Sequence, residues 1–207
     1  MTKVVFVVDD DPSFRTAVTR MLQAAGLGVQ SFACGAELLS HLSGGHLDGS
    51  GCVLADLRMP GLDGLQLQQT CAEAGVELPF VFLTGQGDVP SAVSAMRQGA
   101  IDFLDKCAPQ QALLAALELA LERDANARAS RARRGELKRR FSALTGRETE
   151  VLAQVVHGRM NKQIAATLGI HERTVKLHRS AITSKLGVRS VAELTTLARE
   201  IGRFAEP

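Results

Sequence analysis

Apolar and polar positions alternate along the first 121 residues in a pattern that predicts strands and helices in turn. Five short apolar runs are predicted as strands, at Val4–Val8, Val29–Phe32, Cys52–Ala55, Phe80–Leu83 and Ile101–Leu104. Amphipathic stretches between them are predicted as helices, at Pro12–Ala25, Ala36–Leu42, Gly64–Ala74 and Pro90–Gln98. A further helix is predicted to begin near Pro109, because proline suits the first turn of a helix. Strands that alternate with helices indicate a parallel sheet with right-handed crossovers.

The polarity of the apolar runs predicts their order in this sheet. Val4–Val8 is continuous and rich in valine, as expected of a strand that is buried on both faces. The second and fifth runs are more polar, so they are predicted to form the edges. The fold class that follows is α/β, a flavodoxin-like doubly wound sheet of five parallel strands in the order 2-1-3-4-5.

Beyond this sheet the pattern is helical throughout. From Gln110 it continues into an arginine-rich stretch, where Gly135 is predicted to interrupt the helix. Later helices are predicted at Arg147–His157, Asn161–Leu168, Glu172–Leu186 and Val191–Ile201, the first with a capping box of Thr145 and Glu148. We predict three parts: an α/β domain at 1–122, a helical basic linker at 123–140 and a separate all-α domain of four helices at 141–207.

Charge distinguishes the two halves of the chain. The 207 residues have a net charge of +2, but residues 1–125 carry 7 Lys and Arg against 15 Asp and Glu, a net −8. Residues 126–207 carry 17 against 7, a net +10. An acidic half suits a module that uses cations, and a basic half suits one that binds a polyanion. Because the chain has no Trp or Tyr, contacts with DNA would rely on Lys, Arg, His and hydroxyl groups.

Cysteines and apolar stretches indicate the compartment. The four cysteines (Cys34, Cys52, Cys71 and Cys107) are widely spaced and match no zinc pattern, so they are predicted to be free thiols. No stretch approaches the roughly 18 apolar residues of a membrane helix, and the apolar run near the N-terminus is too short for a signal peptide. We therefore predict a cytoplasmic protein with no membrane partner.

Polar side chains follow four of the predicted strands. Asp9 and Asp10 follow the first strand, Asp56 the third and Thr84 the fourth, and Lys106 comes two residues after the fifth. The carboxyl ends of parallel strands meet at one edge, where such sheets bind ligands. Clustered carboxylates favour a hard cation such as Mg²⁺, and an aspartate is a competent nucleophile toward a phosphoryl group. A threonine hydroxyl and a lysine ammonium can bind phosphoryl oxygens.

Four motifs surround these positions: VVDDDP from Val7, DLRMPGLDG from Asp56, LTG from Leu83 and DFLDK from Asp102. Over about residues 3–122 they resemble the receiver domain of two-component response regulators. The resemblance implies that a histidine kinase phosphorylates Asp56. It implies a Mg²⁺ site formed by Asp9, Asp10, Asp56 and the main-chain carbonyl of Arg58. It also implies that Thr84 and Lys106 contact the phosphoryl group and that Phe103 is an aromatic switch, although a core aromatic fits this last position almost as well.

One position departs from the receiver pattern. The family usually has a proline in a cis peptide after this lysine, whereas here Lys106 is followed by Cys107. A non-proline cis bond costs about 2.5–4 kcal/mol, so we predict a trans Lys106–Cys107 bond and an altered loop after the fifth strand. The altered loop is expected to change how far Lys106 reaches toward the phosphoryl group. The alternative function is a phosphorylation-independent DNA-binding regulator whose receiver serves as a dimerisation domain. A Mg²⁺-dependent phosphohydrolase is disfavoured, because the loops at this edge are short.

The basic half contains a helix-turn-helix pattern, in which an apolar face ends at Gly169 and a turn leads into a second helix. The segments Leu144–Leu152, Asn161–Ile170 and His171–Arg179 resemble the LuxR-type DNA-binding domain of the NarL/FixJ family, over about residues 141–203. The Gly87–Pro90 run adds to the likeness with the FixJ-like branch. The resemblance implies that helix 172–186 enters the major groove. Its predicted DNA contacts are Thr174, Lys176, Leu177 and Ser180 near the bases, and Arg173, His178 and Arg179 nearer the phosphates.

Two features keep alternative interpretations. Helix Val191–Ile201 matches the helix that pairs two such domains, and it also suits closure of the four-helix core. The arginine-rich stretch suits either a rigid spacer or a contact with the DNA backbone. Together the patterns predict a transcription regulator and not an enzyme. Its predicted partners are a sensor histidine kinase, double-stranded DNA and, when phosphorylated, a second copy on half-sites about 34 Å apart.

Overall fold

The computed structural model describes residues 3–44, 49–85 and 89–201. The chain divides into two compact units, Met1–Arg128 and Ala129–Pro207, and each unit has a hydrophobic core of its own. Gly87 and Asp88, which contribute to the FixJ-like Gly87–Pro90 run, lie outside the described residues.

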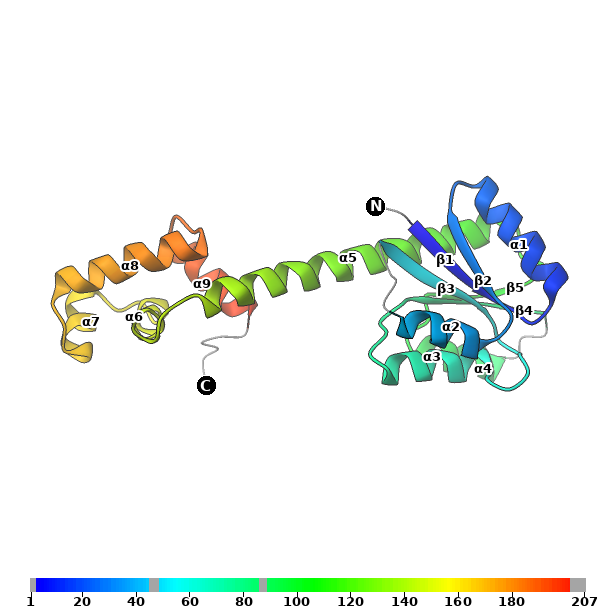
Figure 1. The fold of residues 1–207 in the computed structure, drawn as a ribbon, viewed down its shortest axis with the longest axis horizontal. Coiled ribbons are helices and arrows are strands. Elements are labelled where there is room, and N and C mark those ends of the chain that lie inside the picture. Colours follow the sequence, from blue (N-terminus) through cyan, green and yellow to red (C-terminus); the bar gives the residue numbers. More distant parts are fainter. Residues whose placement is uncertain (1–2, 45–48, 86–88, 202–207) are drawn as a thin grey trace. The chain divides into compact units, whose positions relative to one another are not determined.

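The first unit contains five strands and the helices between them (Figure 1). The strands are β1 (Lys3–Val8), β2 (Gly28–Phe32), β3 (Ser50–Asp56), β4 (Phe80–Thr84) and β5 (Asp102–Asp105). The helices are α1 (Pro12–Ala24), α2 (Gly35–Ser43), α3 (Gly64–Glu73), α4 (Val89–Arg97) and the start of α5 (Gln110–Ser142). All five predicted strands are present.

The strands form one parallel sheet in the order β2-β1-β3-β4-β5, as predicted. Every residue of the central strand β3 is buried, whereas the edge strands β2 and β5 have no buried residue. Polar residues in these two strands face water at no cost, which is why polarity predicted the edges.

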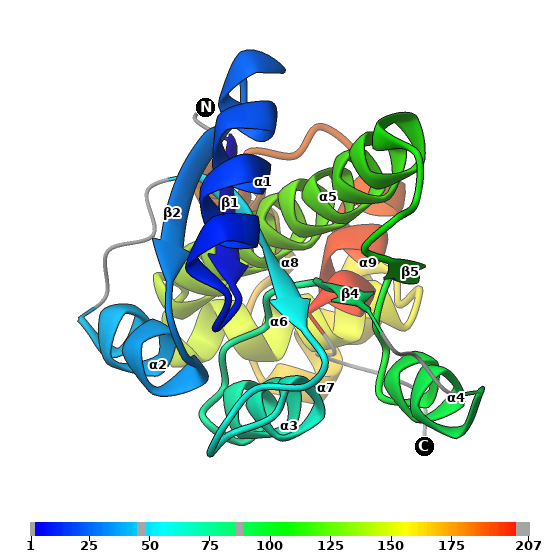
Figure 2. The ribbon, with the colours of Figure 1, turned by 90° about the vertical axis from the view of Figure 1, so that its right-hand side faces the viewer.

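Helices cover both faces of the sheet (Figure 2). On one face α2, α3 and α4 contribute Leu38, Leu67, Cys71 and Ala95 to a core with the phenylalanines Phe6, Phe80 and Phe82. On the other face α1 and α5 contribute Val18, Leu22, Leu113, Leu117 and Leu121 to a core with the alternate strand residues Val5, Val7, Leu54 and Val81. The strand residues that point to opposite faces therefore anchor two separate helix layers.

Helix α5 corrects one prediction, because it continues through Gly135 as far as Ser142. A glycine inside a helix costs only about 1 kcal/mol relative to alanine, and its neighbours in the sequence are mostly alanine, arginine, glutamate and leucine, which favour helix. Beyond the glycine, Leu137 and Phe141 are buried in the second unit. Packing of these residues outweighs the local penalty.

The second unit contains the end of α5 and the helices α6 (Gly146–Val156), α7 (Asn161–Leu168), α8 (Glu172–Leu186) and α9 (Val191–Glu200). The predicted capping box at the start of α6 is confirmed: Thr145 and Glu148 exchange main-chain and side-chain hydrogen bonds. Gly169 ends α7 with a left-handed φ of 63°. Among the described helices, none is both long and apolar enough to cross a membrane.

Candidate functional site

Three aspartates meet at the carboxyl edge of the sheet. Asp9 and Asp10 directly follow β1, and Asp56 is the last residue of β3. One carboxylate oxygen from each lies within 4.8 Å of the others. Asp9 and Asp56 are buried and Asp10 is exposed. The strand order therefore brings together acids that are far apart in the sequence.

Lys106, immediately after β5, joins this cluster. Its Nζ lies 2.7 Å from Oδ2 of Asp9 and 2.7 Å from Oδ2 of Asp56. Burial lowers the pKa of Lys106, but its hydrogen bonds to the two aspartates outweigh that effect, so the pKa is raised overall. Burial also raises the pKa of Asp9, and the hydrogen bond from Lys106 offsets only part of this rise. Lys106 is thus a charged ammonium held by two carboxylates.

Residues of the β1–α1 turn complete the surroundings of Asp9, and sequence reasoning missed them. The Asp11 N–H donates to Oδ1 of Asp9 at 2.9 Å, while its own carboxylate caps α1. The Phe14 ring lies under Lys106, with 4.4 Å between Nζ and the ring centroid, which is a cation–π contact. Arg15 donates to the Asp9 carbonyl. The Asp11-Pro12 pair, a capping residue before a first-turn proline, was the available signal.

Close packing after β3 fixes the position of Asp56. A Cβ on Gly64 would lie 2.4 Å from the Asp56 carbonyl oxygen, so only glycine fits at the start of α3. The Arg58 N–H donates to Oδ1 of Asp56 at 3.2 Å. The loop therefore holds the Asp56 carboxylate from one side while Lys106 holds it from the other.

The loop after β5 resolves the question raised by Cys107. None of the described peptide bonds is cis, so the Lys106–Cys107 bond is trans, as predicted. The Cys107 N–H donates to the Asp105 carboxylate at 2.7 Å, and the Lys106 N–H donates to the Thr84 carbonyl at 2.8 Å. These bonds hold the loop against β4, so Lys106 reaches both aspartates without the usual proline.

Thr84 and Phe103 lie on the neighbouring strands β4 and β5. Thr84 ends β4 and is buried, with 3 % of its surface exposed. Phe103 lies in β5 and is half-buried, with its ring centroid 6.4 Å from that of Phe82. Thr84 thus ends β4, whereas Phe103 pairs with Phe82, two residues before the ends of the two strands.

The donor set of this site fits a hard divalent cation. Three carboxylates against one ammonium leave a surplus of negative charge, which oxygen ligation of a divalent ion relieves. The same surplus disfavours approach of a phosphoryl donor unless a cation is bound. The residues present are thus compatible with Mg²⁺ and with an aspartate that acts as a nucleophile.

Helix α8 presents the second candidate site, a basic outer face. Its inner face is apolar, with Val175, Ile182 and Leu186 buried in the core of the second unit. Among the residues predicted to contact DNA, the exposed ones are Arg173, Lys176, Leu177 and Ser180, and the half-buried ones are Thr174, His178 and Arg179. Leu177 has 64 % of its surface exposed.

Polar contacts with α6 and α7 hold α8 in place. Lys185 near its end donates to the buried Glu148 carboxylate of α6 at 2.7 Å, and this contact holds the pKa of Glu148 below its ordinary value. Arg179 donates to Asn161 of α7 at 2.7 Å. These partners could not be predicted from local patterns, because each pair joins different helices.

Comparison with known families matches both units. Residues 5–118 match the response regulator receiver domain, and residues 142–198 match the bacterial regulatory proteins of the luxR family. The chain belongs to the NarL/FixJ-type response regulators. A receiver domain implies a histidine kinase as partner, and a luxR-type domain implies binding to DNA.

This response regulator resembles characterised relatives over almost its whole length. It is 40% identical to nodulation protein W of Bradyrhizobium diazoefficiens, over 96% of this chain and 86% of that protein. It is 38% identical to the transcriptional regulatory protein FixJ of Azorhizobium caulinodans, over 94% and 90%. The solved structure of the response regulator StyR is 44% identical and has a TM-score of 0.87, covering 97% of this chain and 100% of that one.

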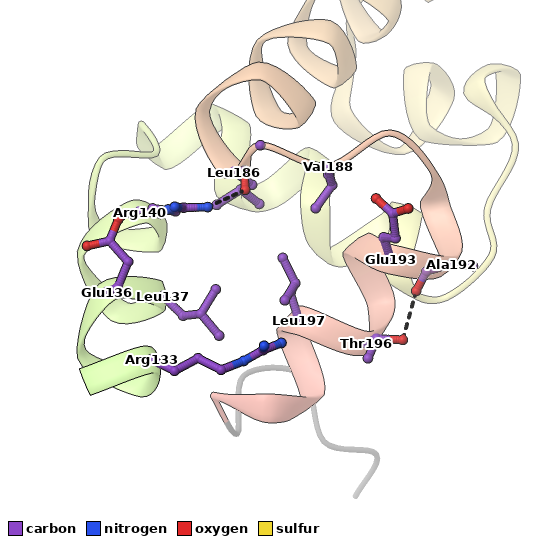
Figure 3. A pocket seen from close by; sticks show the side chains of 11 residues that line it. Arg133, Glu136, Leu137, Arg140, Leu186, Val188, Ala192, Glu193, Thr196 and Leu197 are labelled. Carbon is purple, nitrogen blue, oxygen red and sulfur yellow. Dashed lines mark hydrogen bonds and ion pairs between the residues drawn. The ribbon is translucent and has the colours of Figure 1, made fainter. Parts of the chain in front are cut away.

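The second unit of the response regulator also contains a groove of about 610 Å³ between the end of α5 and α9 (Figure 3). Its floor is apolar and includes Leu137 and Leu197. The charged residues on its rim are bound within the fold: Arg133 pairs with Glu200, and Arg140 donates to the Leu186 carbonyl. We assign no ligand to this groove.

All four cysteines are free thiols, as predicted. Cys52 and Cys71 are buried, and burial raises their pKa to about 12 and about 11 respectively. Cys34 is half-buried and Cys107 is exposed. The two core cysteines therefore stay as unreactive thiols at neutral pH.

Proposed function

We propose that Asp56 is the phosphoacceptor of this response regulator and that phosphorylation there controls binding to DNA and transcription. A carboxylate oxygen of Asp56 attacks phosphorus in the phosphohistidine of a sensor kinase. The P–N bond breaks, the histidine leaves and an aspartyl-phosphate forms. The observation that carries the proposal is the position of Lys106, 2.7 Å from both Asp9 and Asp56 in a cluster of three carboxylates.

We assign Mg²⁺ as the cofactor of this reaction, held by Asp9, Asp10, Asp56 and the main-chain carbonyl of Arg58. The ion would neutralise charge on the carboxylates and on the phosphoryl oxygens. Lys106 supplies a second positive charge, and the Thr84 hydroxyl donates a hydrogen bond to the phosphoryl group. We assign no metabolic reaction to the protein, since the phosphoryl group stays on its own side chain as a signal.

A signal of this kind requires an interaction that exists only after phosphorylation. The Thr84 hydrogen bond to the phosphoryl group meets this requirement, because it favours one state of the domain over the other. Phe103, on the neighbouring strand, is the proposed aromatic switch that reorients when Thr84 moves. The face formed by α4, β5 and α5 is then the surface that changes.

Helix α8 is the proposed recognition helix in the major groove of double-stranded DNA. Thr174, Lys176, Leu177 and Ser180 are assigned to the bases, and Arg173 and His178 to phosphates. The exposed Leu177 supports this assignment, because an apolar side chain in the major groove packs against the methyl group of thymine. Contacts with phosphates make the affinity fall steeply with salt.

Phosphorylation is proposed to favour a homodimer. Two recognition helices then bind half-sites about 34 Å apart, and the second contact becomes effectively intramolecular. For the parts of the chain we retain the receiver at 1–122, the basic helical linker at 123–140 and the DNA-binding domain at 141–207. The neighbouring family matches at 5–118 and 142–198 support this division.

The test measures affinity for DNA with and without a small phosphodonor. The duplex is one recovered from a random library by the full chain in the presence of acetyl phosphate and Mg²⁺. We expect tighter binding with acetyl phosphate, and a mass gain of one phosphoryl group that Asp56→Asn abolishes together with the change in affinity. Equal affinity in both conditions would support the alternative, a DNA-binding regulator whose receiver only dimerises.

A further inference from the structure

Arg179 belongs to the recognition helix, yet its side chain is held within the DNA-binding unit. Its Nη1 donates to Oδ1 of Asn161, 2.7 Å away in α7, and both residues are half-buried. Two other basic residues of α8 behave differently. Arg173 and Lys176 are exposed, and Lys176 lies 3.9 Å from Glu172 of its own helix. Arg179 therefore differs from the side chains that face solvent on the same helix.

The partner of Arg179 lies at one end of a very short helix. Asn161 is the first of the eight residues of α7. At the other end, the carbonyl of Leu168 accepts a hydrogen bond from Arg147 of α6. Helices this short have little stability of their own, so the contacts at the two ends hold α7 between α6 and α8.

We propose that Arg179 is a positioning residue of the recognition helix and not a ligand of DNA phosphate. The inference rests on the proposed binding to DNA through α8. A hydrogen bond from a guanidinium is stronger than one between neutral groups, and Arg179 would have to break it to reach a phosphate. Holding α7 against α8 before DNA arrives reduces the ordering that binding requires.

The proposal predicts that Arg179 and Asn161 act as one unit. Arg179→Met and Asn161→Ala should each weaken binding to the library-derived duplex about tenfold, the loss expected for one charged hydrogen bond. The double variant should lose no more than either single variant, because both remove the same contact. Asn161→Asp keeps an acceptor for the guanidinium and should bind nearly as well as the unmodified chain.

Salt dependence separates positioning from phosphate contact. Log affinity falls with log salt concentration, and each lost phosphate contact reduces the steepness of this fall, the slope referred to here, by about one. Arg173→Met is the matched control, since it removes an exposed arginine from the same helix, and its slope should fall by about one. Arg179→Met should keep the slope of the unmodified chain. A slope that falls as in the control, with losses that add to those of Asn161→Ala, would overturn the proposal.

Hydrogen exchange of the full chain without DNA keeps this test independent of the proposed function. Arg179→Met and Asn161→Ala should both speed amide exchange in the peptide that covers α7, whereas Arg173→Met should not. Unchanged exchange in α7 would refute the positioning role. If the unmodified chain recovered no duplex from the library, the DNA-binding function would fail while exchange still decided whether Arg179 holds α7.

Discussion

Lys106 sets the charge balance of the carboxylate cluster. It is the ammonium that holds the buried Asp9 and Asp56 together at 2.7 Å. Its positive charge also neutralises part of the negative charge of these two carboxylates. A bound divalent cation and Lys106 therefore perform overlapping electrostatic tasks.

Replacing Lys106 by methionine should make the full chain depend on Mg²⁺ for stability. Without the ion, the free energy of unfolding should fall by about 1–3 kcal/mol, since two buried carboxylates lose their charged donor. Mg²⁺ should then raise the denaturation midpoint of Lys106→Met more than that of the unmodified chain. Lys3→Met, an exposed lysine at the other end of the sheet, is the control. Equal Mg²⁺ shifts in all three proteins would contradict this role.

Glu148 should make the DNA-binding unit sensitive to acid. Its hydrogen bonds with Lys185 and the Thr145 N–H hold its pKa in the folded chain below the ordinary value of 4.5. The stabilisation is therefore complete above 4.5 and is lost as the pH falls through the lowered pKa. Glu148→Gln should be less stable at neutral pH and lose less stability on acidification.

Denaturant midpoints followed by circular dichroism at a series of pH values measure this effect. Glu150→Gln is the matched control, because Glu150 lies on the same helix with an exposed side chain and a surface partner, Arg147. It should follow the pH profile of the unmodified chain. Identical profiles for the two variants would show that the Glu148 pair does not carry the pH dependence.

At the scale of single elements, α5 is anchored to the sheet by a buried acid that sequence reasoning missed. Asp124 has 1 % of its surface exposed, and its Oδ2 accepts from the Gly51 N–H of β3 at 2.8 Å and from Arg128 at 2.6 Å. An aspartate in a charged helical stretch looks like a solvated residue. Only the fold reveals that the amino end of β3 lies beside it.

Asp124→Ala should lower the free energy of unfolding of the first unit by about 1–3 kcal/mol, because the buried Gly51 N–H loses its acceptor. Asp124→Asn keeps a carbonyl oxygen there and should cost less. Urea denaturation of the full chain measures both, with the exposed Glu122→Ala as the control. A loss for Asp124→Ala no larger than that of the control would rule out the anchor.

The elements that the sequence predicted well are those fixed by local pattern. Strand order followed from the polarity of the edges, and the capping box at Thr145 followed from residues three positions apart. The extent of α5 did not, because Gly135 marks a helix end only when no packing lies beyond it. The buried Leu137 and Phe141 supply that packing. Contacts such as Arg179–Asn161 could not be predicted from the sequence either, since they depend on how helices are placed in space.

For the whole molecule, the continuity of α5 leads to a prediction about signal transmission. Gly135→Pro should break the helix, at a cost of about 3 kcal/mol, inside the second unit and ahead of the buried residues Leu137 and Phe141. If the response to phosphorylation requires a continuous helix, the ratio of DNA affinities with and without acetyl phosphate should fall toward one.

Gly135→Ala is the matched control at the same position, because a Cβ there meets nothing within 4 Å and alanine favours helix. It should preserve the ratio of affinities. The mass gain on treatment with acetyl phosphate should be the same in both variants. A full response in Gly135→Pro would show that α5 serves only as a tether.

The residue that replaced the family's proline also gives the molecule a natural attachment point for a reporter. Cys107 is exposed beside Lys106, while burial keeps Cys52 and Cys71 protonated at neutral pH. With Cys34 replaced by serine, a maleimide fluorophore would couple at one place, next to the aspartate that receives the phosphoryl group. The fluorophore would then report phosphorylation in real time on a protein that has no tryptophan or tyrosine of its own.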